Sequence, residues 1–230
     1  MTRYFITGAS RGIGRAIAEK LAQPETTLLL HGRDRKALTE TCRRIEAKGA
    51  RGIELCCDLT DKAQIEKLIK DVDREPLDVL INNAGIAVVK PFDSISLEEW
   101  ERTLAVNVTA PFLLTQKLTA KMKAGSSVVN ILSIAAKTGF PNWSSYCMSK
   151  FALEGLSQSI REELRSRGIR VINIYPAATD TDIWNAIEGE WPREKMISAQ
   201  DVANAVAFAL SQSVDVLIEN ITLGNSAGGL

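Results

Sequence analysis

The stretch of sequence that decides the fold of this chain is Thr7-Gly8-Ala9-Ser10-Arg11-Gly12-Ile13-Gly14. A strand-like apolar run, Arg3–Thr7, precedes it, and a helical pattern, Gly12–Gln23, follows it. Between a strand and a helix, such glycines permit a tight turn, let the backbone approach a pyrophosphate, and allow close helix–strand packing. The helix N-terminus also favours the bound anion. We therefore expect a dinucleotide-binding turn; the alternative is a tight turn with a purely structural role.

Strand-like runs and helical patterns alternate along the rest of the chain. The expected strands are 3–7, 27–31, 52–57, 78–81, 126–132, 169–175 and 214–223, and the expected helices are 12–23, 35–48, 61–74, 97–123, 144–167 and 198–211. This alternation predicts an α/β fold, a doubly wound parallel sheet of seven strands (a Rossmann fold) with helices on both faces. No composition break divides it, so we expect residues 1–230 to form a single domain. Pro111 should kink its helix or start a new one.

Composition narrows the partners and the location. The 230 residues carry 28 basic and 28 acidic side chains, which gives no reason to expect a nucleic acid or an anionic membrane as partner. The N-terminus enters a strand directly, which leaves no room for a signal peptide. The four cysteines show no CxxC spacing. We expect a cytoplasmic protein with reduced thiols, no membrane span and no metal site.

The tip of the second expected strand indicates which dinucleotide binds. NAD-binding proteins place an acidic residue at this point, whereas NADP-binding proteins place an arginine nearby. This chain has Gly32 at the tip, followed by Arg33, and Arg11 adds a second guanidinium from the glycine turn. Guanidinium groups bind phosphate in a bidentate way, so a 2′-phosphate is expected and NADPH is predicted over NADH. Asp34 is the one dissenting residue, and we expect it to start the following turn.

A second group of residues is suited to proton transfer. Tyr146 and Lys150 are four positions apart, so they share one face if a helix begins here. Ser133 follows the expected strand 126–132. A nearby ammonium group should lower the pKa of the phenol toward neutrality, and a hydroxyl can hold a substrate oxygen. Taken alone, the Tyr–Lys pair is also typical of an exposed helix face.

With these motifs placed, the chain resembles the short-chain dehydrogenase/reductase family along nearly its whole length. The matching motifs are the glycine turn Thr7–Gly14, Asp58 in Cys-Asp-Leu-Thr, Asn82-Asn83-Ala84-Gly85, Asn107 in Ala-Val-Asn-Val, and Ser133, Tyr146 and Lys150. The resemblance implies an NADP(H)-dependent oxidoreductase that interconverts a carbonyl and an alcohol.

The resemblance also implies the role of each catalytic residue. Tyr146 would be the general acid in reduction and the general base in oxidation. Lys150 would bind the nicotinamide ribose and lower the pKa of Tyr146, and Ser133 would hold the substrate oxygen. Asn107 would position a water that links Lys150 to solvent, although a buried residue that satisfies backbone groups is the alternative.

The expected cofactor contacts extend over much of the chain. They are Gly8, Ser10, Arg11, Gly12, Ile13, Gly14, Arg33, Asp58, Leu59, Asn83, Ala84, Gly85, Tyr146, Lys150, Pro176 and Thr181. Thr181 is the expected contact to the nicotinamide carboxamide, with Thr179 as the alternative. Ala177 replaces a glycine of the family, which would cost about 1 kcal/mol if that position needed a positive φ.

The substrate is less determined than the cofactor. Residues 181–197 occupy the family's substrate-lid position, and the side chains expected to form an apolar pocket are Val88, Ala135, Phe140, Trp143 and Trp184. Trp143 and Trp191 have packing of the lid or an oligomer contact as an alternative role. The C-terminal Ile218–Asn225 resembles that of reductases acting on small carbonyls, hydroxy acids or pterins.

Three functions remain open at this point. A small-carbonyl reductase is the leading expectation, with a 3-oxoacyl thioester reductase as the alternative and a non-catalytic NADPH-binding sensor as a third. The family resemblance also implies a homodimer or homotetramer that pairs the helices 97–123 and 144–167.

Overall fold

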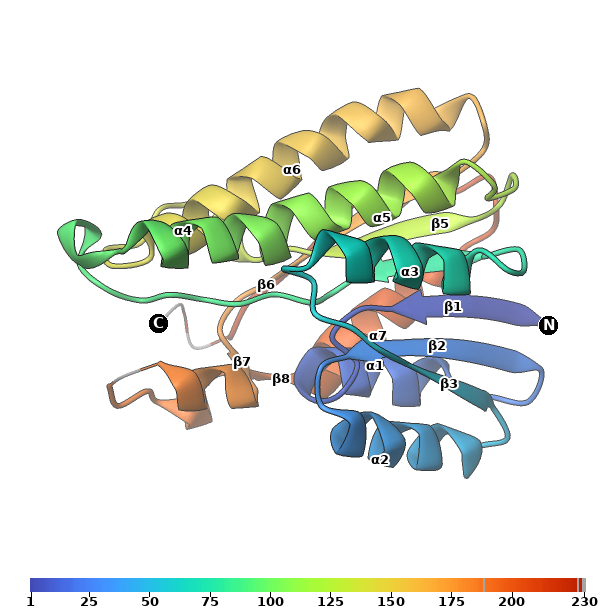
Figure 1. The fold of residues 1–230 in the computed structure, drawn as a ribbon, viewed down its shortest axis with the longest axis horizontal. Coiled ribbons are helices and arrows are strands. Elements are labelled where there is room, and N and C mark those ends of the chain that lie inside the picture. Colours follow the sequence, from blue (N-terminus) through green and yellow to red (C-terminus); the bar gives the residue numbers. More distant parts are fainter. Residues whose placement is uncertain (188, 227, 229–230) are drawn as a thin grey trace.

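The computed structural model describes residues 1–187, 189–226 and 228. Its main feature is a sheet of seven parallel strands in the order β3-β2-β1-β4-β5-β6-β9 (Figure 1). The strands are β1 Thr2–Ile6, β2 Thr26–Gly32, β3 Arg51–Cys56, β4 Val79–Asn82, β5 Ser127–Ile131, β6 Arg170–Pro176 and β9 Asn220–Leu223. The strand order reverses between β1 and β4, which creates a crevice at the carboxyl ends of the strands.

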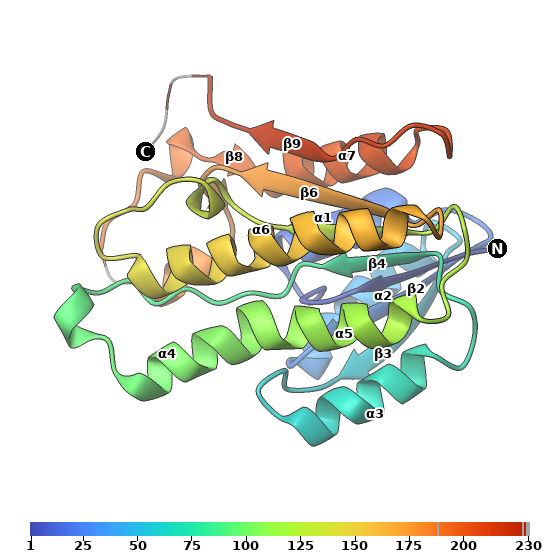
Figure 2. The same ribbon diagram turned by 90° about the horizontal axis from the view of Figure 1, so that it is seen from above.

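Helices cover both faces of this sheet, as the two views show (Figures 1 and 2). One face carries α1 Gly12–Leu21, α2 Arg35–Glu46 and α7 Ala199–Leu210; the other carries α3 Lys62–Val72, α4 Leu97–Leu104, α5 Ala110–Thr119 and α6 Ser144–Arg165. Each face buries its own apolar core. Strand β2 is buried along its whole length, as its Leu28-Leu29-Leu30 run predicts for a central parallel strand. The doubly wound α/β fold is therefore confirmed.

Two expected elements differ from the structure. Strand β9 covers only Asn220–Leu223, although the carbonyl of the preceding Glu219 still accepts from the Asn173 N–H at 2.8 Å. The long helix 97–123 ends at Thr119 and changes geometry before its proline: Ala105–Thr109 form a π-helical turn between α4 and α5. A proline ring clashes with the carbonyl four residues earlier, which here belongs to Asn107. The distortion therefore lies one turn before Pro111.

A row of asparagines crosses the sheet from β4 to β9. The register places Asn82 beside Asn130, Asn130 beside Asn173, and Asn173 beside Asn220. Asn82 Nδ2 donates to Asn130 Oδ1 at 2.9 Å, and Asn130 Nδ2 donates to Asn173 Oδ1 at 3.2 Å. Tyr175 connects the last pair, because its hydroxyl accepts from Asn173 Nδ2 and donates to Asn220 Oδ1 at 2.9 Å. We call these four residues the asparagine row.

The segment 181–197 forms short elements beside the carboxyl ends of the strands. It contains two 3₁₀ helices, Asp182–Ala186 and Arg193–Lys195. Its end is joined to the residues after β6 by a two-stranded parallel sheet, β7 Thr179–Asp180 and β8 Ile197–Ser198. Arg193 also donates to Asp180 Oδ1 at 2.7 Å and to the carbonyl of Thr181 at 3.0 Å. These bonds hold the segment against the main sheet.

Candidate active site

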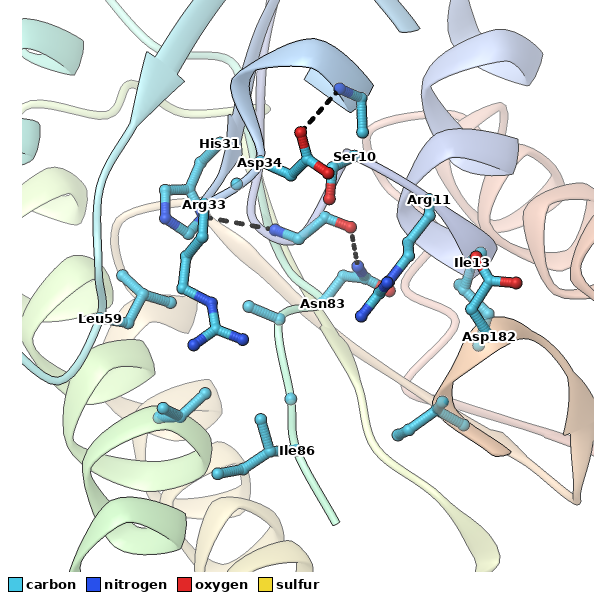
Figure 3. A pocket seen from close by; sticks show the side chains of 18 of the residues that line it. Ser10, Arg11, Ile13, His31, Arg33, Asp34, Leu59, Asn83, Ile86 and Asp182 are labelled. Atoms are coloured by element: carbon cyan, nitrogen blue, oxygen red, sulfur yellow. Dashed lines mark hydrogen bonds between the residues drawn. The ribbon is translucent and has the colours of Figure 1, made fainter. Parts of the chain in front are cut away.

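A first cavity of about 280 Å³ lies at the carboxyl ends of β1, β2 and β4. Twelve of the residues expected to contact a cofactor line it: Gly8, Ser10, Arg11, Gly12, Ile13, Arg33, Asp58, Leu59, Asn83, Ala84, Gly85 and Thr181. Figure 3 shows how their side chains surround the space. Segments that are far apart in the sequence therefore meet at the position where a Rossmann-type sheet binds its ligand.

The backbone of the glycine turn shapes this cavity. Gly8 and Gly12 both adopt positive φ, at 67° and 56°. Gly14 is not among the residues that line this cavity, and a Cβ there would lie 2.2 Å from the Gly8 carbonyl oxygen. Its role is the close packing that the spacing predicts. Asn83 completes the turn, since its Nδ2 donates to the carbonyls of Thr7 at 2.8 Å and Gly8 at 3.2 Å.

Two arginines supply the positive charge of the first cavity. The guanidinium groups of Arg11 and Arg33 enter it from opposite sides (Figure 3). Asp34 also lines the cavity, and its carboxylate caps α2 by accepting from the Ala37 N–H at 3.1 Å. Asp58 accepts from the backbone and hydroxyl of Thr60, and these bonds hold the pKa of its carboxyl below the usual value. The cavity thus combines a backbone cradle with two cations, which fits a dinucleotide that carries an extra phosphate.

His31 is a residue of this cavity that sequence reasoning missed. It is the penultimate residue of β2 and is buried; its Nδ1 accepts from the Gly8 N–H at 3.3 Å and its Nε2 lies 3.1 Å from the Cys57 carbonyl. The ring therefore links the glycine turn to the segment that carries Asp58. Burial lowers the pKa of His31 to about 4, so the ring is neutral near pH 7. The available signal was that the chain has a single histidine, placed at a strand end.

A second cavity of about 230 Å³ adjoins the first, and Ile13, Thr181 and Ile183 line both. Ser133 and Tyr146 line the second cavity, together with Ala135, Phe140, Trp143 and Trp184 from the expected apolar set. Val88 from that set is not among its lining residues, whereas Trp191 is. Pro176, expected at the cofactor, also lines the second cavity rather than the first. Pro176 is the last residue of β6, at the end of the strand that faces the second cavity.

Tyr146 and Lys150 share a face of α6, as their spacing predicts. Helix α6 begins at Ser144, so Tyr146 lies in its first turn and Lys150 in the next. Lys150 is buried and lines neither cavity; its Nζ donates to the Ile131 carbonyl at 2.9 Å and lies 5.6 Å from the centre of the Tyr146 ring. Ser133 follows β5 and accepts from the Ala135 N–H at 3.1 Å. Strand β5 and helix α6 therefore bring the three side chains together.

The pKa of Tyr146 shifts in the opposite direction to the sequence-based expectation. Burial raises the pKa of its phenol to about 12, although hydrogen bonding with Ser133 acts in the other direction. Burial also lowers the pKa of the Lys150 ammonium to about 8. Both shifts favour the neutral forms, because desolvation penalises charge wherever it resides. At neutral pH the phenol therefore carries its proton, as a proton donor must.

Asn107 lies in the π-helical turn and is buried. Its Oδ1 accepts from the Ile86 N–H at 2.9 Å, while its Nδ2 donates to the Ile86 carbonyl at 2.9 Å and to Ser149 Oγ at 3.0 Å. The side chain is thus fully engaged in joining the loop after β4 to α6. Its backbone carbonyl lacks the usual helical donor, because Pro111, four residues later, has no N–H. A buried structural role is therefore visible for Asn107.

The segment after β6 contains the two threonines considered for the carboxamide contact, and Ala177 at the position of the family glycine. Thr181 lines both cavities, whereas the Thr179 hydroxyl donates to the Ala177 carbonyl at 2.9 Å. Thr181 is thus the better placed of the two threonines. Among the described residues, only Glu25 and Asn142 combine a side chain with a positive φ, so Ala177 is not strained in this way. Replacement of the family glycine therefore leaves the backbone undisturbed.

The chain belongs to the short chain dehydrogenase family, whose profile matches residues 3–191. This confirms the family resemblance and the oxidoreductase class. Among curated proteins, a sepiapterin reductase of Chlorobaculum tepidum is 31% identical, with 98% of this chain and 96% of that protein covered. The 3-oxoacyl-[acyl-carrier-protein] reductase FabG of Aquifex aeolicus is 34% identical over 90% of this chain and 89% of its own.

The fold has close counterparts among solved structures. A short chain dehydrogenase from Burkholderia cenocepacia, in complex with NADP, matches with a TM-score of 0.89 and 30% identity. The match covers 98% of this chain and 97% of the other. Across the described residues of the present chain, no helix is long and apolar enough to cross a membrane.

Proposed function

We propose that this protein is an NADPH-dependent reductase of small carbonyl compounds, reversible as an alcohol dehydrogenase. The observation that carries the proposal is the junction of the two cavities. The first offers a backbone cradle and two guanidinium groups, and the second places the Tyr146 phenol and the Ser133 hydroxyl beside an apolar space. A dinucleotide in the first cavity would reach the second past Ile13 and Thr181, which line both.

The residues of the site have distinct roles in this reaction. When bound, NADPH supplies a hydride to the carbonyl carbon. The Ser133 hydroxyl orients the carbonyl oxygen, and Tyr146 transfers its phenolic proton to that oxygen as the carbon–oxygen π bond breaks, which yields the alcohol. Lys150 stabilises the negative charge that develops on Tyr146 and holds the nicotinamide ribose. Asn107 would position a water that links Lys150 to solvent and resupplies the proton.

The preference for NADPH is part of the proposal. Arg11 and Arg33 are the cations of the first cavity that suit a 2′-phosphate, and Asp34 is engaged in capping α2. Among the remaining predicted contacts, Gly12 suits the pyrophosphate and Asp58 would contact the adenine ring. The NADP complex of the Burkholderia cenocepacia protein supports this assignment. Tighter binding of NADH than of NADPH would contradict it.

A panel of carbonyl compounds tests the proposed activity. NADPH oxidation should be measured with 1,2-diketones, β-keto esters, aromatic ketones, pterins and acyl thioesters. We expect turnover of small ketones or diketones. Fastest turnover of a 3-oxoacyl thioester would instead favour the thioester reductase, an activity that the FabG relative makes the second candidate. Tight NADPH binding without turnover of any compound would favour a non-catalytic sensor.

The Tyr146→Phe variant tests the proton donor directly. Removal of the hydroxyl should lower kcat by about 10²- to 10⁴-fold, the usual contribution of a general acid, while the Kd for NADPH stays within about twofold. Substrate turnover and cofactor fluorescence titration measure the two quantities separately. Turnover within about threefold of the unmodified protein would refute the role of Tyr146.

The assembly we propose is a homodimer or homotetramer. Of the apolar residues on the two long helices, Leu153 is buried in the core, whereas Phe112 on α5 and Phe151 on α6 are 41% and 46% exposed. Two exposed phenylalanines on neighbouring helices suit a self-complementary contact. Light scattering should give at least a dimeric mass at micromolar concentration, and Phe112→Glu with Phe151→Glu should give a monomer. A monomeric mass for the unmodified protein would exclude the assembly.

Three further expectations complete the proposal. Residues 1–230 would act as one domain, and residues 181–197 would act as a short lid beside the second cavity, because Trp184 and Trp191 in that segment line it. A cytoplasmic location is supported by the four free cysteines, since disulfides persist mainly in oxidising compartments. Limited proteolysis tests the first two expectations: a protected main body with cleavage near 181–197 that NADPH suppresses would support them. Cleavage into two stable halves would contradict the single domain.

A further inference from the structure

The wall of the second cavity is built largely from indole rings. Trp143, at the start of α6, lies 5.7 Å from Trp184 and 6.1 Å from Trp191 between ring centroids, and the latter two are 4.8 Å apart. Trp143 also packs edge-on against the Tyr146 ring, with 5.5 Å between centroids. The proton donor and the three indoles therefore form one continuous aromatic surface.

Polar groups are sparse on this surface. Among the described residues that line the second cavity, none is Asp, Glu, Lys, Arg or His. The Thr179 hydroxyl donates to the Ala177 carbonyl, and the Trp184 indole N–H donates to the Thr179 carbonyl at 2.9 Å. A charged substituent held against this wall would therefore lose hydration on that side without gaining an ionic partner, which is unfavourable. The cavity suits an uncharged molecule with a polar group facing Ser133 and Tyr146; the buried Trp191 indole N–H, which has no hydrogen-bond partner among the described residues, is a further donor in its wall.

The ring spacing argues against an organic cation as the occupant. A cage for a quaternary ammonium group directs several ring faces toward a central ion, which lies within about 6 Å of each centroid. Here the indoles pack against one another in edge-to-face and tilted contacts, with centroids 4.8 to 6.1 Å apart. No cation fits between rings that already touch. The surface instead offers ring edges and faces to one neighbouring aromatic group.

The size of the cavity limits the occupant further. An apolar protein cavity of about 150 Å³ holds a benzene molecule. The second cavity, at about 230 Å³, has room for one benzene-sized ring and a short carbonyl-bearing chain. A long acyl chain or a fused polycyclic molecule would extend beyond this volume through the open side of the cavity.

We infer that the substrate of the second cavity is an uncharged ketone bearing a single aromatic ring, with the ring against Trp143, Trp184 and Trp191 and the ketone oxygen at Tyr146 and Ser133. This inference rests on the proposed reductase function. It adds that specificity comes from the three indoles rather than from an ionic contact.

A set of three substrates tests the inference with NADPH as the reductant. They are 1-phenyl-1,2-propanedione, which is aromatic and uncharged, 2,3-butanedione, which is aliphatic and uncharged, and phenylglyoxylate, which is aromatic and anionic. We expect kcat/KM for the phenyl diketone to exceed each of the other two by at least about tenfold, the effect of burying an aromatic ring in a matched apolar site. Equal or faster turnover of butanedione or phenylglyoxylate overturns the inference and leaves the reductase function intact. Absence of turnover with all three overturns both.

Variants of one indole then locate the specificity. Trp184→Leu should lower the ratio of kcat/KM for the phenyl diketone to that for butanedione by about tenfold. Trp184→Phe, which keeps a ring, should restore most of the ratio. Trp100→Leu is the matched control, because Trp100 on α4 is the fourth tryptophan of the chain and does not line the cavity. Thermal melting verifies that each variant folds, and an unchanged ratio in folded Trp184→Leu overturns the assignment.

Discussion

The two cavities are built by different means. Backbone atoms shape the first one: glycines leave no room for side chains, and Asn83 and His31 bind carbonyls and amides of the turn. Side chains shape the second, where three indoles and Phe140 form the wall. A backbone cradle tolerates few substitutions and serves one ligand that many relatives share. A wall of side chains changes with single substitutions, so it is the part of the fold in which a substrate can be chosen.

A glycine-to-alanine substitution next to each cavity should show the largest difference in stability between the two. Gly14→Ala places a Cβ 2.2 Å from the Gly8 carbonyl, so the turn must move; we expect a loss of about 3 kcal/mol and a fall in Tm of about 10 °C. Gly139→Ala, beside the second cavity, meets no atom within 4 Å and should change Tm by less than about 2 °C. Thermal melting measures both. Similar losses for the two variants would remove the distinction between the cavities.

Charge provides the next contrast, because the cations belong to the first cavity alone. Arg33→Ala should raise the Kd for NADPH by about 30-fold, the value of one charge-assisted contact, and leave the Kd for NADH within about twofold. Arg35→Ala, two residues further on at the start of α2, is the matched control outside the cavity. Titration of each variant with both cofactors gives the answer. A parallel loss of NADH affinity would show that Arg33 supports the cavity instead of reading the phosphate.

Lys150 lies behind the junction of the two cavities, and its titration should appear in the reaction. Burial lowers the pKa of its ammonium from 10.5 to about 8. The cation that stabilises the developing charge on Tyr146 is present below that pH and is lost above it. We therefore expect kcat for reduction to fall about tenfold per pH unit above pH 8. The Tyr146 pKa, raised to about 12, excludes the phenol as the source of this limb.

The pH profile of a charged replacement checks this assignment. Lys150→Arg stays cationic throughout the range, so its kcat, although reduced, should be flat between pH 7.5 and 9.5 by this argument. A wild-type profile that is itself flat to pH 9.5 would show that Lys150 keeps its proton when the site is in use.

His31 provides the smallest expected effect. Its pKa is about 4 in the folded protein and 6.5 when unperturbed, so between these values the unfolded chain binds more protons. The free energy of unfolding should therefore decrease as pH falls from 7 to 5.5, by about 1 kcal/mol. Asp58, which raises this pKa, and Arg33, which lowers it, are the charges that act on the ring. Denaturant unfolding at the two pH values measures the change.

His31→Gln is the control for this measurement. The chain has no other histidine, so the variant should show little change in stability between pH 7 and pH 5.5. An equal decrease in both proteins would assign the effect to carboxylates. That result would show that the His31 imidazole does not cause the pH dependence of the stability.

How far the sequence determined these features differs between the cavities. The first follows from fixed spacings, since a strand, a glycine turn and a helix define where a pyrophosphate binds. Even there His31 was missed, because its function depends on two backbone groups that only the folded chain brings to it. The second cavity is a meeting of distant segments. From the sequence, Trp191 could have packed the lid or formed an oligomer contact. In the structure it lines the second cavity together with Trp143.

Two further differences have simple physical causes. The pattern Tyr146–Lys150 indicated the charge that favours a phenolate, but it carries no information on burial, and desolvation has the larger effect on the pKa. Pro111 marked the distorted helix correctly, but the distortion itself lies in the π-helical turn Ala105–Thr109, before the proline. In both cases the sequence identified the residue that causes the change, but not the degree of burial or the position in the helix that decides its result.

The asparagine row has a consequence for folding. Parallel strands made of valine, isoleucine and leucine pair almost equally well in several registers, because one apolar side chain resembles the next. A slip of two residues keeps the apolar face inward, but it separates Asn82 from Asn130 and breaks the buried hydrogen bond between their side chains. It would also displace Ser133, three residues beyond Asn130, by about 7 Å, at about 3.3 Å per residue. The row thus favours the native strand register. A compact state with shifted strands and a misplaced Ser133 would be less stable than the native state, because it lacks these hydrogen bonds.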